Sequence, residues 1–406
     1  MKRNLLITNA IIDDKKQDIL IEKGKIVRVG RISSSSGIHL LDANGKIVLP
    51  GFVNIHTHLD KADLISRMKP EEFGGTLEQN RELIKKFKKN YTKKDIKDRA
   101  KRVITEMVAM GITAIRTHVD VDPICGLLPM EALLELQEEI DIVELHLVAF
   151  PQQGVLSNEK RDLVDKAVSL GANLVGGLPL VEHDRDGWRK HIDLIFDIAA
   201  KYNKDIEVQI DESNDPDDFA LPLLVEKTLE AKFYGRVTAT HVISLSKIEA
   251  KEAKEIIAAM KEAGIKVIVT PSANLITRFP NDKKVWGYNS ITRIKDLIDA
   301  GIEVAIGTDN IRDPFFPFGN GSMIREIHTL IVATRMTTPN DIEEVFKMAT
   351  INGAKMMGLN YGISEGKKGD MVIFDTDTLI GILNSPEKIN YVIKDGEIIY
   401  GRDERK

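Results

Sequence analysis

Cysteine is nearly absent from this sequence: Cys125 is the only one among 406 residues. One cysteine excludes an internal disulfide framework and any zinc site built from several thiolates. A bound metal would therefore need histidine and carboxylate ligands. Proteins without disulfides suit a reducing compartment, so we expect a cytoplasmic location.

The sequence also lacks long apolar runs and an excess of positive charge. No stretch approaches the ~20 consecutive apolar residues of a membrane span, and no signal-peptide apolar region follows the N-terminus. Lys and Arg total 57 against 62 Asp and Glu, which leaves no basic field to attract nucleic acid phosphates. We expect neither a membrane nor a nucleic acid as a partner.

Both ends of the chain read as short β-strands separated by turns. Strand patterns fill the first part of the chain, and similar ones cover 370–374 and 390–400. Asp395-Gly396 between two apolar runs predicts a hairpin. We predict that residues 1–49 and 364–406 together form a small β-sandwich domain.

Between these ends, residues 50–363 alternate apolar strand patterns with amphipathic helix patterns such as 94–110 and 245–263. The eight strand candidates are 52–58, 114–121, 143–150, 174–180, 206–211, 237–243, 267–270 and 304–308. After a long insertion over 61–90 they recur about every thirty residues, the length of one βα unit. Eight such units predict an α/β fold, a closed (β/α)8 TIM barrel, rather than an open doubly wound sheet.

Chemistry in a TIM barrel lies at the C-terminal ends of the strands, and polar residues gather there. His56 and His58 end the first strand and, being two residues apart, share a face from which both can bind one ion. Further polar residues at or just after strand ends are Gln152, Gln209, Asp211, Glu212, His241, Asp309 and Asn310. Alone, Asp309 reads as a cap on a helix or turn. A buried set of three histidines and one aspartate, however, has few uses other than binding a metal. His118, at the end of the second strand, is a candidate support for those ligands.

Several stretches carry a resemblance to a known family. They are 51–60, 75–77, 116–121, 148–154, 235–241, 309–314 and the tail 366–374. The sequence resembles the amidohydrolase superfamily, in the branch of bacterial cytosine deaminase and N-isopropylammelide isopropylaminohydrolase. The resemblance implies one divalent metal ion per chain, zinc or iron, with His56, His58 and Asp309 as ligands. The fourth predicted strand has no lysine that could be carbamylated to bridge a second metal, which favours one metal over two.

The resemblance also implies roles for other residues. His241 would polarise the attacking water, Glu212 would carry its proton to a ring nitrogen, and Asp309 would help to pass protons to the leaving amine. The residues implied to bind the substrate are Gln152, Asn310, Leu77 and Phe315. We also expect a homo-oligomer.

Three positions depart from the family pattern. Gln209 stands where the family places a fourth histidine ligand; its neutral amide is a weaker ligand, and Asp211 is an alternative on the same strand face. Asn310 stands where cytosine deaminase has a second aspartate, and Phe315 where it has tryptophan. These differences indicate a ring other than cytosine.

The function that we expect is a metal-dependent hydrolase of C–N bonds. Its most direct form is a cytosine-deaminase-like aminohydrolase that releases ammonia or an amine from a pyrimidine or triazine ring. One alternative is hydrolysis of a cyclic amide. Another, suggested by Gln209, is a binding protein that keeps the barrel but no longer holds a metal.

Overall fold

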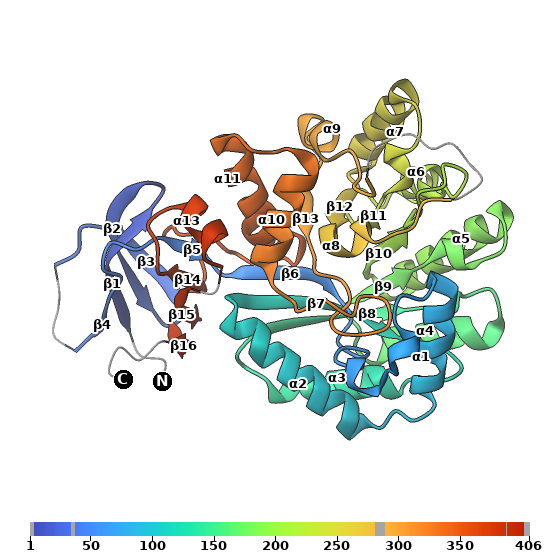
Figure 1. Cartoon of the computed structure of the whole chain (residues 1–406), viewed down its shortest axis with the longest axis horizontal. Helices are drawn as coiled ribbons and strands as arrows, with labels where there is room; N and C mark the ends of the chain where they lie inside the picture. Colours follow the sequence, from blue (N-terminus) through green and yellow to red (C-terminus); the bar gives the residue numbers. More distant parts are fainter. Residues whose placement is uncertain (1–3, 34–36, 281–288, 387, 402–406) are drawn as a thin grey trace.

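The computed structural model describes residues 4–33, 37–280, 289–386 and 388–401. Eight parallel strands form one sheet in sequence order from β6 to β13 (Figure 1). They are β6 (Phe52–Thr57), β7 (Ile112–Asp120), β8 (Glu144–Phe150), β9 (Leu174–Gly177), β10 (Asp205–Ile210), β11 (Val237–His241), β12 (Lys266–Val269) and β13 (Val304–Ile306). The predicted (β/α)8 barrel is confirmed.

The barrel closes between its first and last strands. The backbone N–H of Asp309, just after β13, donates to the carbonyl of His56 on β6 at 2.9 Å, and Thr57 forms a parallel bridge with Asp309. We call this junction the β13–β6 seam. It places the ends of the first and eighth strands side by side, as the sequence pattern requires of a shared site.

The predicted strand positions agree with the structure except in length. The fourth prediction, 174–180, runs too far, because β9 ends at Gly177 and the 3-10 turn η3 (Pro179–Val181) begins with a proline. Proline cannot donate a hydrogen bond to a neighbouring strand. The predicted helix 245–263 is likewise split into η4 (Ser244–Ser246) and α7 (Ala250–Ala263).

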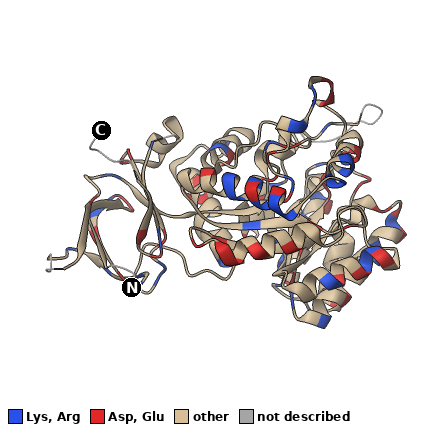
Figure 2. Ribbon diagram, turned by 90° about the horizontal axis from the view of Figure 1, so that it is seen from below, with Lys and Arg blue, Asp and Glu red and all other residues tan. Residues whose placement is uncertain are grey.

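Helices follow the strands and cover the outside of the barrel. They are α2 (Lys93–Ala109), α3 (Leu128–Glu139), α4 (Asn158–Leu170), α5 (Arg185–Tyr202), α6 (Leu221–Glu230), α8 (Pro271–Leu275), α9 (Ile294–Asp299), α10 (Met323–Thr334), α11 (Pro339–Lys347), the π-helical turn η5 (Met348–Asn352) and α12 (Gly353–Met356). Most of their inner faces pack with the strands into one apolar core, and α12 packs with residues of β6, β7, β12 and β13 in a second apolar cluster. Basic and acidic residues alternate along the outer helices (Figure 2), consistent with the balanced charge of the sequence. In the described part of the chain, no helix is both long and apolar enough to cross a membrane.

The insertion after the first strand contains two 3-10 turns, η1 (Ile65–Arg67) and η2 (Pro70–Glu72), and helix α1 (Leu77–Lys88). Thr76 caps α1 by accepting from the Gln79 N–H, while the Gln79 side chain accepts from the Thr76 N–H. Reciprocal capping of this kind fixes where a helix begins. As a result, α1 has a defined start beside the C-terminal ends of the strands, where its first turns help to line the cavity described below.

The two chain ends build a β unit beside the barrel (Figure 1). One sheet has the order β3-β2-β1-β4 and the other β16-β15-β14-β5. Their strands are β1 (Leu5–Ile12), β2 (Lys15–Glu22), β3 (Lys25–Gly30), β4 (His39–Asp42), β5 (Val48–Pro50), β14 (Met371–Phe374), β15 (Ile389–Lys394) and β16 (Glu397–Gly401); α13 (Leu379–Asn384) lies between β14 and β15.

Residues from both ends share the core of this β unit, for example Ile19 with Met371 and Ile393. The predicted β-sandwich is therefore confirmed, as is the hairpin at Asp395-Gly396 between β15 and β16. The domain boundaries at 49/50 and 363/364 stay predictions. The first and last residues of the predicted β domain, 1–3 and 402–406, lie outside the described residues.

Candidate active site

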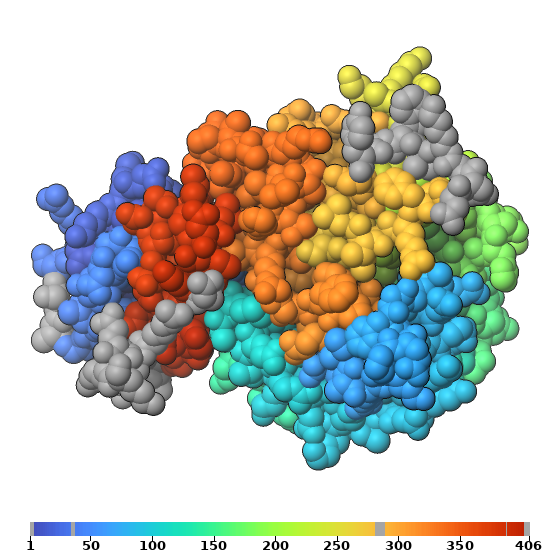
Figure 3. All heavy atoms as spheres, viewed as in Figure 1, coloured from blue at the N-terminus to red at the C-terminus, as the bar shows by residue number. Residues whose placement is uncertain are grey.

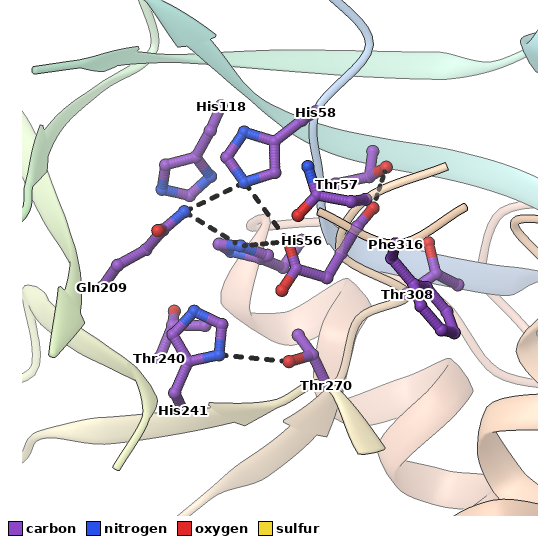
Figure 4. A network of polar contacts seen from close by, with 12 residues as sticks. His56, Thr57, His58, His118, Gln209, Thr240, His241, Thr270, Thr308 and Phe316 are labelled. Carbon is purple, nitrogen blue, oxygen red and sulfur yellow. Dashed lines mark hydrogen bonds and ion pairs between the residues drawn. The ribbon is translucent and has the colours of Figure 1, made fainter. Parts of the chain in front are cut away.

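Two histidines and one aspartate converge at the β13–β6 seam. Nε2 of His58 lies 3.3 Å from Oδ1 of Asp309, and Nε2 of His56 lies 3.7 Å from the same oxygen. All three side chains are buried. Figure 4 shows the imidazoles of His56, on β6, and His58, just after it, pointing toward the same point. The sequence predicted this convergence from strand ends alone.

Gln209 on β10 completes the cluster. Its amide nitrogen lies 3.0 Å from Nε2 of His58 and 3.3 Å from Nε2 of His56. A half turn of the amide places its oxygen in the same position, where it is a possible metal ligand. Of the two residues considered for the fourth ligand position, Gln209 is thus the one beside the histidines.

Asp211 lies elsewhere, so the alternative in which it replaces the fourth ligand is not what the structure shows. Its carboxylate accepts hydrogen bonds from the N–H groups of Ala220 at 2.7 Å and Leu221 at 3.1 Å, at the start of α6. The backbone turns into the left-handed region at Asp211, with φ of 55°, which breaks the two-residue alternation of the strand. The side chain therefore caps a helix.

Glu207, two residues before Gln209 on β10, forms a hydrogen bond with the ring nitrogen of His56 that faces away from the cluster. Its Oε1 lies 2.8 Å from Nδ1 of His56, and its Oε2 accepts from Arg116 at 2.9 Å. Burial alone would raise its pKa, but the charge of His118, the His56 hydrogen bond and Arg116 lower the pKa of Glu207 to about 2. Sequence reasoning missed this residue, although its spacing from Gln209 places both on one strand face.

Two further histidines, His118 and His241, lie beside the cluster. The ring of His118 on β7 lies 4.3 Å from that of His56, centroid to centroid, which places it beside the ligands as expected for a supporting residue. His241 on β11 has its Nδ1 within 3.1 Å of Thr270 Oγ1 and 2.9 Å of Asn274 Nδ2. Its Nε2 is buried and has no hydrogen-bond partner among the described residues.

The donor set fits a divalent metal ion. Two imidazoles, one carboxylate and one amide approach a common point, and atoms of His56, His241 and Asp309 lie close enough to share an ion. Histidine and carboxylate are the ligands that zinc and iron accept when thiolates are absent. A buried imidazole nitrogen without a partner, as in His241, is costly unless something else occupies the space in front of it.

A cavity of about 410 Å³ opens from this cluster, within the ~300–1,000 Å³ typical of small-molecule sites. It is lined by His58, Gln209, Glu212 and Asp309, and by the four residues predicted to contact the substrate: Leu77, Gln152, Asn310 and Phe315. The structure therefore brings residues from five separate parts of the chain to one cavity. Its remaining walls include Lys61, Arg81 and Arg278, which sequence reasoning did not select.

Two polar residues of the cavity wall, Gln152 and Asn310, are already hydrogen-bonded to other side chains. The Gln152 side-chain oxygen accepts from Lys61 Nζ at 3.2 Å, and Lys61 also pairs with Asp120 at 2.7 Å. Asn310 donates from Nδ2 to Asp313 Oδ2 at 2.6 Å. Each amide is therefore held in a fixed orientation, with Gln152 free to donate and Asn310 free to accept.

Glu212 stands between the cluster and the open cavity. Its Oε2 lies 3.8 Å from Nε2 of His241. Burial, and then the charge of Asp309, raise the pKa of Glu212 to about 8, against the opposing effect of Arg81. A carboxyl group whose pKa lies near neutrality can both accept and donate a proton, which is what general acid–base catalysis requires.

Comparison with known proteins agrees with this geometry. The profile of the amidohydrolase family matches residues 47–401. The chain belongs to the amidohydrolase family. It is therefore a hydrolase by family, and the cluster at its barrel mouth occupies the face where TIM-barrel enzymes act.

Individual relatives cover nearly the whole amidohydrolase chain. N-isopropylammelide isopropyl amidohydrolase of Pseudomonas sp. (strain ADP) is 30% identical over 98% of this chain and 97% of that protein. The structure of 5-methylcytosine deaminase from Klebsiella pneumoniae with 5-fluorocytosine has a TM-score of 0.90 at 28% identity, covering 99% of this chain and 98% of that one. N-isopropylammelide isopropylaminohydrolase from Burkholderia multivorans has a TM-score of 0.85 at 28% identity, with 98% of both chains covered.

Proposed function

We propose that this protein is a metal-dependent aminohydrolase that releases ammonia or an amine from a pyrimidine or triazine ring. The observation that carries the proposal is the convergence of His56, His58, Gln209 and Asp309 at the closed end of a cavity that also contains Glu212. The names of the relatives, a deaminase of 5-methylcytosine and aminohydrolases of N-isopropylammelide, support this substrate class.

One zinc or iron ion per chain would be held by His56, His58 and Asp309, with the Gln209 oxygen as a weaker fourth ligand. A bound divalent ion supplies activation of water at neutral pH, by lowering its pKa from 15.7 to about 7. Glu207 keeps the proton of His56 on Nδ1 and so leaves Nε2 free to coordinate.

Protons move through two residues. Glu212 accepts a proton from the attacking water and delivers it to a ring nitrogen, and His241, 3.8 Å away, faces the same space and orients the water. The water forms a C–O bond to the ring carbon as it gives up this first proton. Asp309 takes the second proton of the same water and passes it to the leaving amine, the C–N bond breaks, and the ring carbon keeps the oxygen in place of nitrogen.

Gln152 and Asn310 select the ring. With its oxygen held by Lys61, Gln152 presents its N–H2 group to a ring carbonyl or nitrogen. With its nitrogen held by Asp313, Asn310 presents its oxygen to an exocyclic amine or ring N–H. Leu77 and Phe315 supply apolar contacts to the ring faces. A cytoplasmic location and a homo-oligomeric state are further proposals that rest on the sequence alone.

Two measurements test the proposal. Elemental analysis of protein purified without added metal is expected to give about one zinc or iron per chain, and the His56→Ala variant to give much less. A screen of aminopyrimidines, aminotriazines and N-alkylaminotriazines is then expected to release ammonia or amine. Activity only on cyclic amides would replace the proposed reaction with ring opening.

A metal-free binding protein is the second candidate, and Gln209 is the observation that favours it. The buried carboxylate of Asp309 beside two imidazoles argues against it, because a charge there needs compensation. Metal-free protein that binds rings without turnover would support this candidate.

A further inference from the structure

Arg81 is a cation in the cavity wall that forms no ion pair with any carboxylate of the described residues. It lies on α1, is partly buried, and lines the cavity. Its Nε atom is buried and has no hydrogen-bond partner among the described residues, and no ion pair of Arg81 is found there either. A guanidinium nitrogen withdrawn from water in this way is costly unless a hydrogen-bond acceptor meets it.

The other cations that line the cavity in the described part of the chain, Lys61 and Arg278, have partners. Lys61 pairs with Asp120 at 2.7 Å, behind the wall. Arg278, after β12, donates from one terminal nitrogen to the carbonyl of Gly74 at 2.7 Å and so joins its segment to the one that precedes α1. Figure 3 shows these two segments, blue and yellow, meeting over the barrel mouth. Arg81 is thus the cavity cation whose partner has to come from elsewhere.

Carboxylates inside the cavity do not provide that partner. Burial lowers the pKa of Arg81, and the charges of Glu212 and Glu78 oppose this, but neither carboxylate forms an ion pair with Arg81. Asp309 faces His56 and His58. The reacting carbon has to lie beside Glu212 and Asp309, so a substituent elsewhere on the ring lies toward the other walls of the cavity, one of which is Arg81 on α1.

We propose that Arg81 binds a carboxylate of the substrate, so that the ring hydrolysed by this enzyme is a nitrogen heterocycle with a carboxylate substituent away from the reacting carbon. The inference rests on the proposed function for the identity of the reacting ring. Carboxylate is the favoured anion because the planar guanidinium fork matches a planar carboxylate through two parallel hydrogen bonds. Leu77, Ile276 and Phe316 supply the apolar walls that a flat ring needs next to this polar edge.

The test compares binding of uracil, uracil-5-carboxylate and uracil-6-carboxylate to the metal-loaded protein by isothermal titration calorimetry. These compounds have the form of reaction products, so binding requires no turnover. We expect at least one carboxylate to bind roughly 10- to 100-fold more tightly than uracil, the range for a hydrogen-bonded charge pair. In Arg81→Met this preference over uracil should disappear, and in Arg81→Lys part of it should remain. Arg161→Met on α4, outside the cavity, is the matched control.

Two results would overturn the inference. One is a wild-type protein that binds neither carboxylate more tightly than uracil. The other is an Arg81→Met protein that weakens all three compounds equally, since that pattern would mean that Arg81 acts on Glu212 or on the position of α1. If Arg81→Met fails to fold, Arg81→Lys decides, because a single ammonium cannot reproduce the two-pronged contact and must reduce the preference.

Failure of the inference can be distinguished from failure of the proposed function. Ammonia release from neutral rings with no carboxylate preference would support the aminohydrolase and remove the inference. An Arg81-dependent carboxylate preference in a protein that releases no amine from any ring would do the reverse.

Discussion

Nδ1 of His56 lies 2.8 Å from Oε1 of Glu207, and this contact decides which nitrogen of His56 faces the cluster. The ring donates its Nδ1 proton to the carboxylate, so Nε2 carries the lone pair that points toward His58 and Asp309. Arg116 holds the second oxygen of Glu207 at 2.9 Å. The orientation of His56, a proposed metal ligand, is therefore set by the ion pair of Glu207 and Arg116.

Glu207→Gln is expected to weaken metal binding by ~10- to 100-fold, the usual effect of losing a carboxylate behind a ligating histidine. The amide can donate to Nδ1 and thereby favour the wrong ring form. Chelator competition measures the affinity. Glu226→Gln, which removes an exposed carboxylate paired with Arg189, is the control. Equal affinities in the two variants would contradict the role given to Glu207.

Glu212→Gln is expected to keep the metal and to lose turnover by ~10²- to 10⁴-fold, because the amide has nearly the same shape but cannot carry a proton. Metal content and amine release are measured on the same preparation. A variant that retains near-wild-type kcat would remove Glu212 from the proton path.

Gln209→His is expected to raise the affinity for zinc or iron, because imidazole is a better ligand for both than a neutral amide oxygen. The new ring would face Nε2 of both His56 and His58, where the glutamine amide now lies. Competition with a chromogenic chelator gives the two affinities. Weaker binding by the variant would show that Gln209 does not stand at a ligand position.

Asp313 provides a pH-dependence prediction. Burial raises its pKa to about 7, opposed by Lys61, Asn310 and the N–H groups of Phe316 and Phe315. The folded protein therefore holds a proton that the unfolded chain, with an ordinary pKa near 3.8, releases. This contribution to stability is fully present below about pH 4 and is lost as the pH rises toward 7.

Asp313→Asn removes that titration. The difference in Tm between wild type and Asp313→Asn should therefore shift in favour of the variant by a few degrees between pH 4.5 and pH 7.5. Differential scanning calorimetry at both pH values checks it. A difference that does not change with pH would mean that Asp313 is ionised throughout this range.

The barrel and the cluster of proposed ligands could be predicted because both leave local signals. Buried parallel strands read as short apolar runs, and His56, His58 and Asp309 stand where such runs end. Glu207 leaves no such signal, because an acidic residue within a strand ordinarily reads as exposed. Its partner Arg116 is 91 residues away, and only the closed barrel brings the two together.

Arg81 was missed for a different reason. A charged residue near the start of an amphipathic helix usually faces water, and the pattern of α1 is that of an ordinary surface helix. That one turn of α1 faces the cavity depends on how the insertion folds back over the strand ends, which no short-range pattern records. Lys61 and Asp120 were missed for a similar reason, since they are buried as an ion pair whose members come from different parts of the chain.

The distance between the proposed ligands depends on how closely the first and last strands of the barrel approach each other at the β13–β6 seam. The hydrogen bond that closes the barrel joins the backbone of His56 to that of Asp309, so both side chains start from the same junction. Gly307 makes this approach possible, because a methyl group there would lie 2.5 Å from Cβ of His56 and 2.7 Å from its carbonyl oxygen. An alanine at 307 would force the two strands apart and separate the ligands without altering any of them. The geometry of the proposed site thus depends on Gly307, a residue that has no side chain.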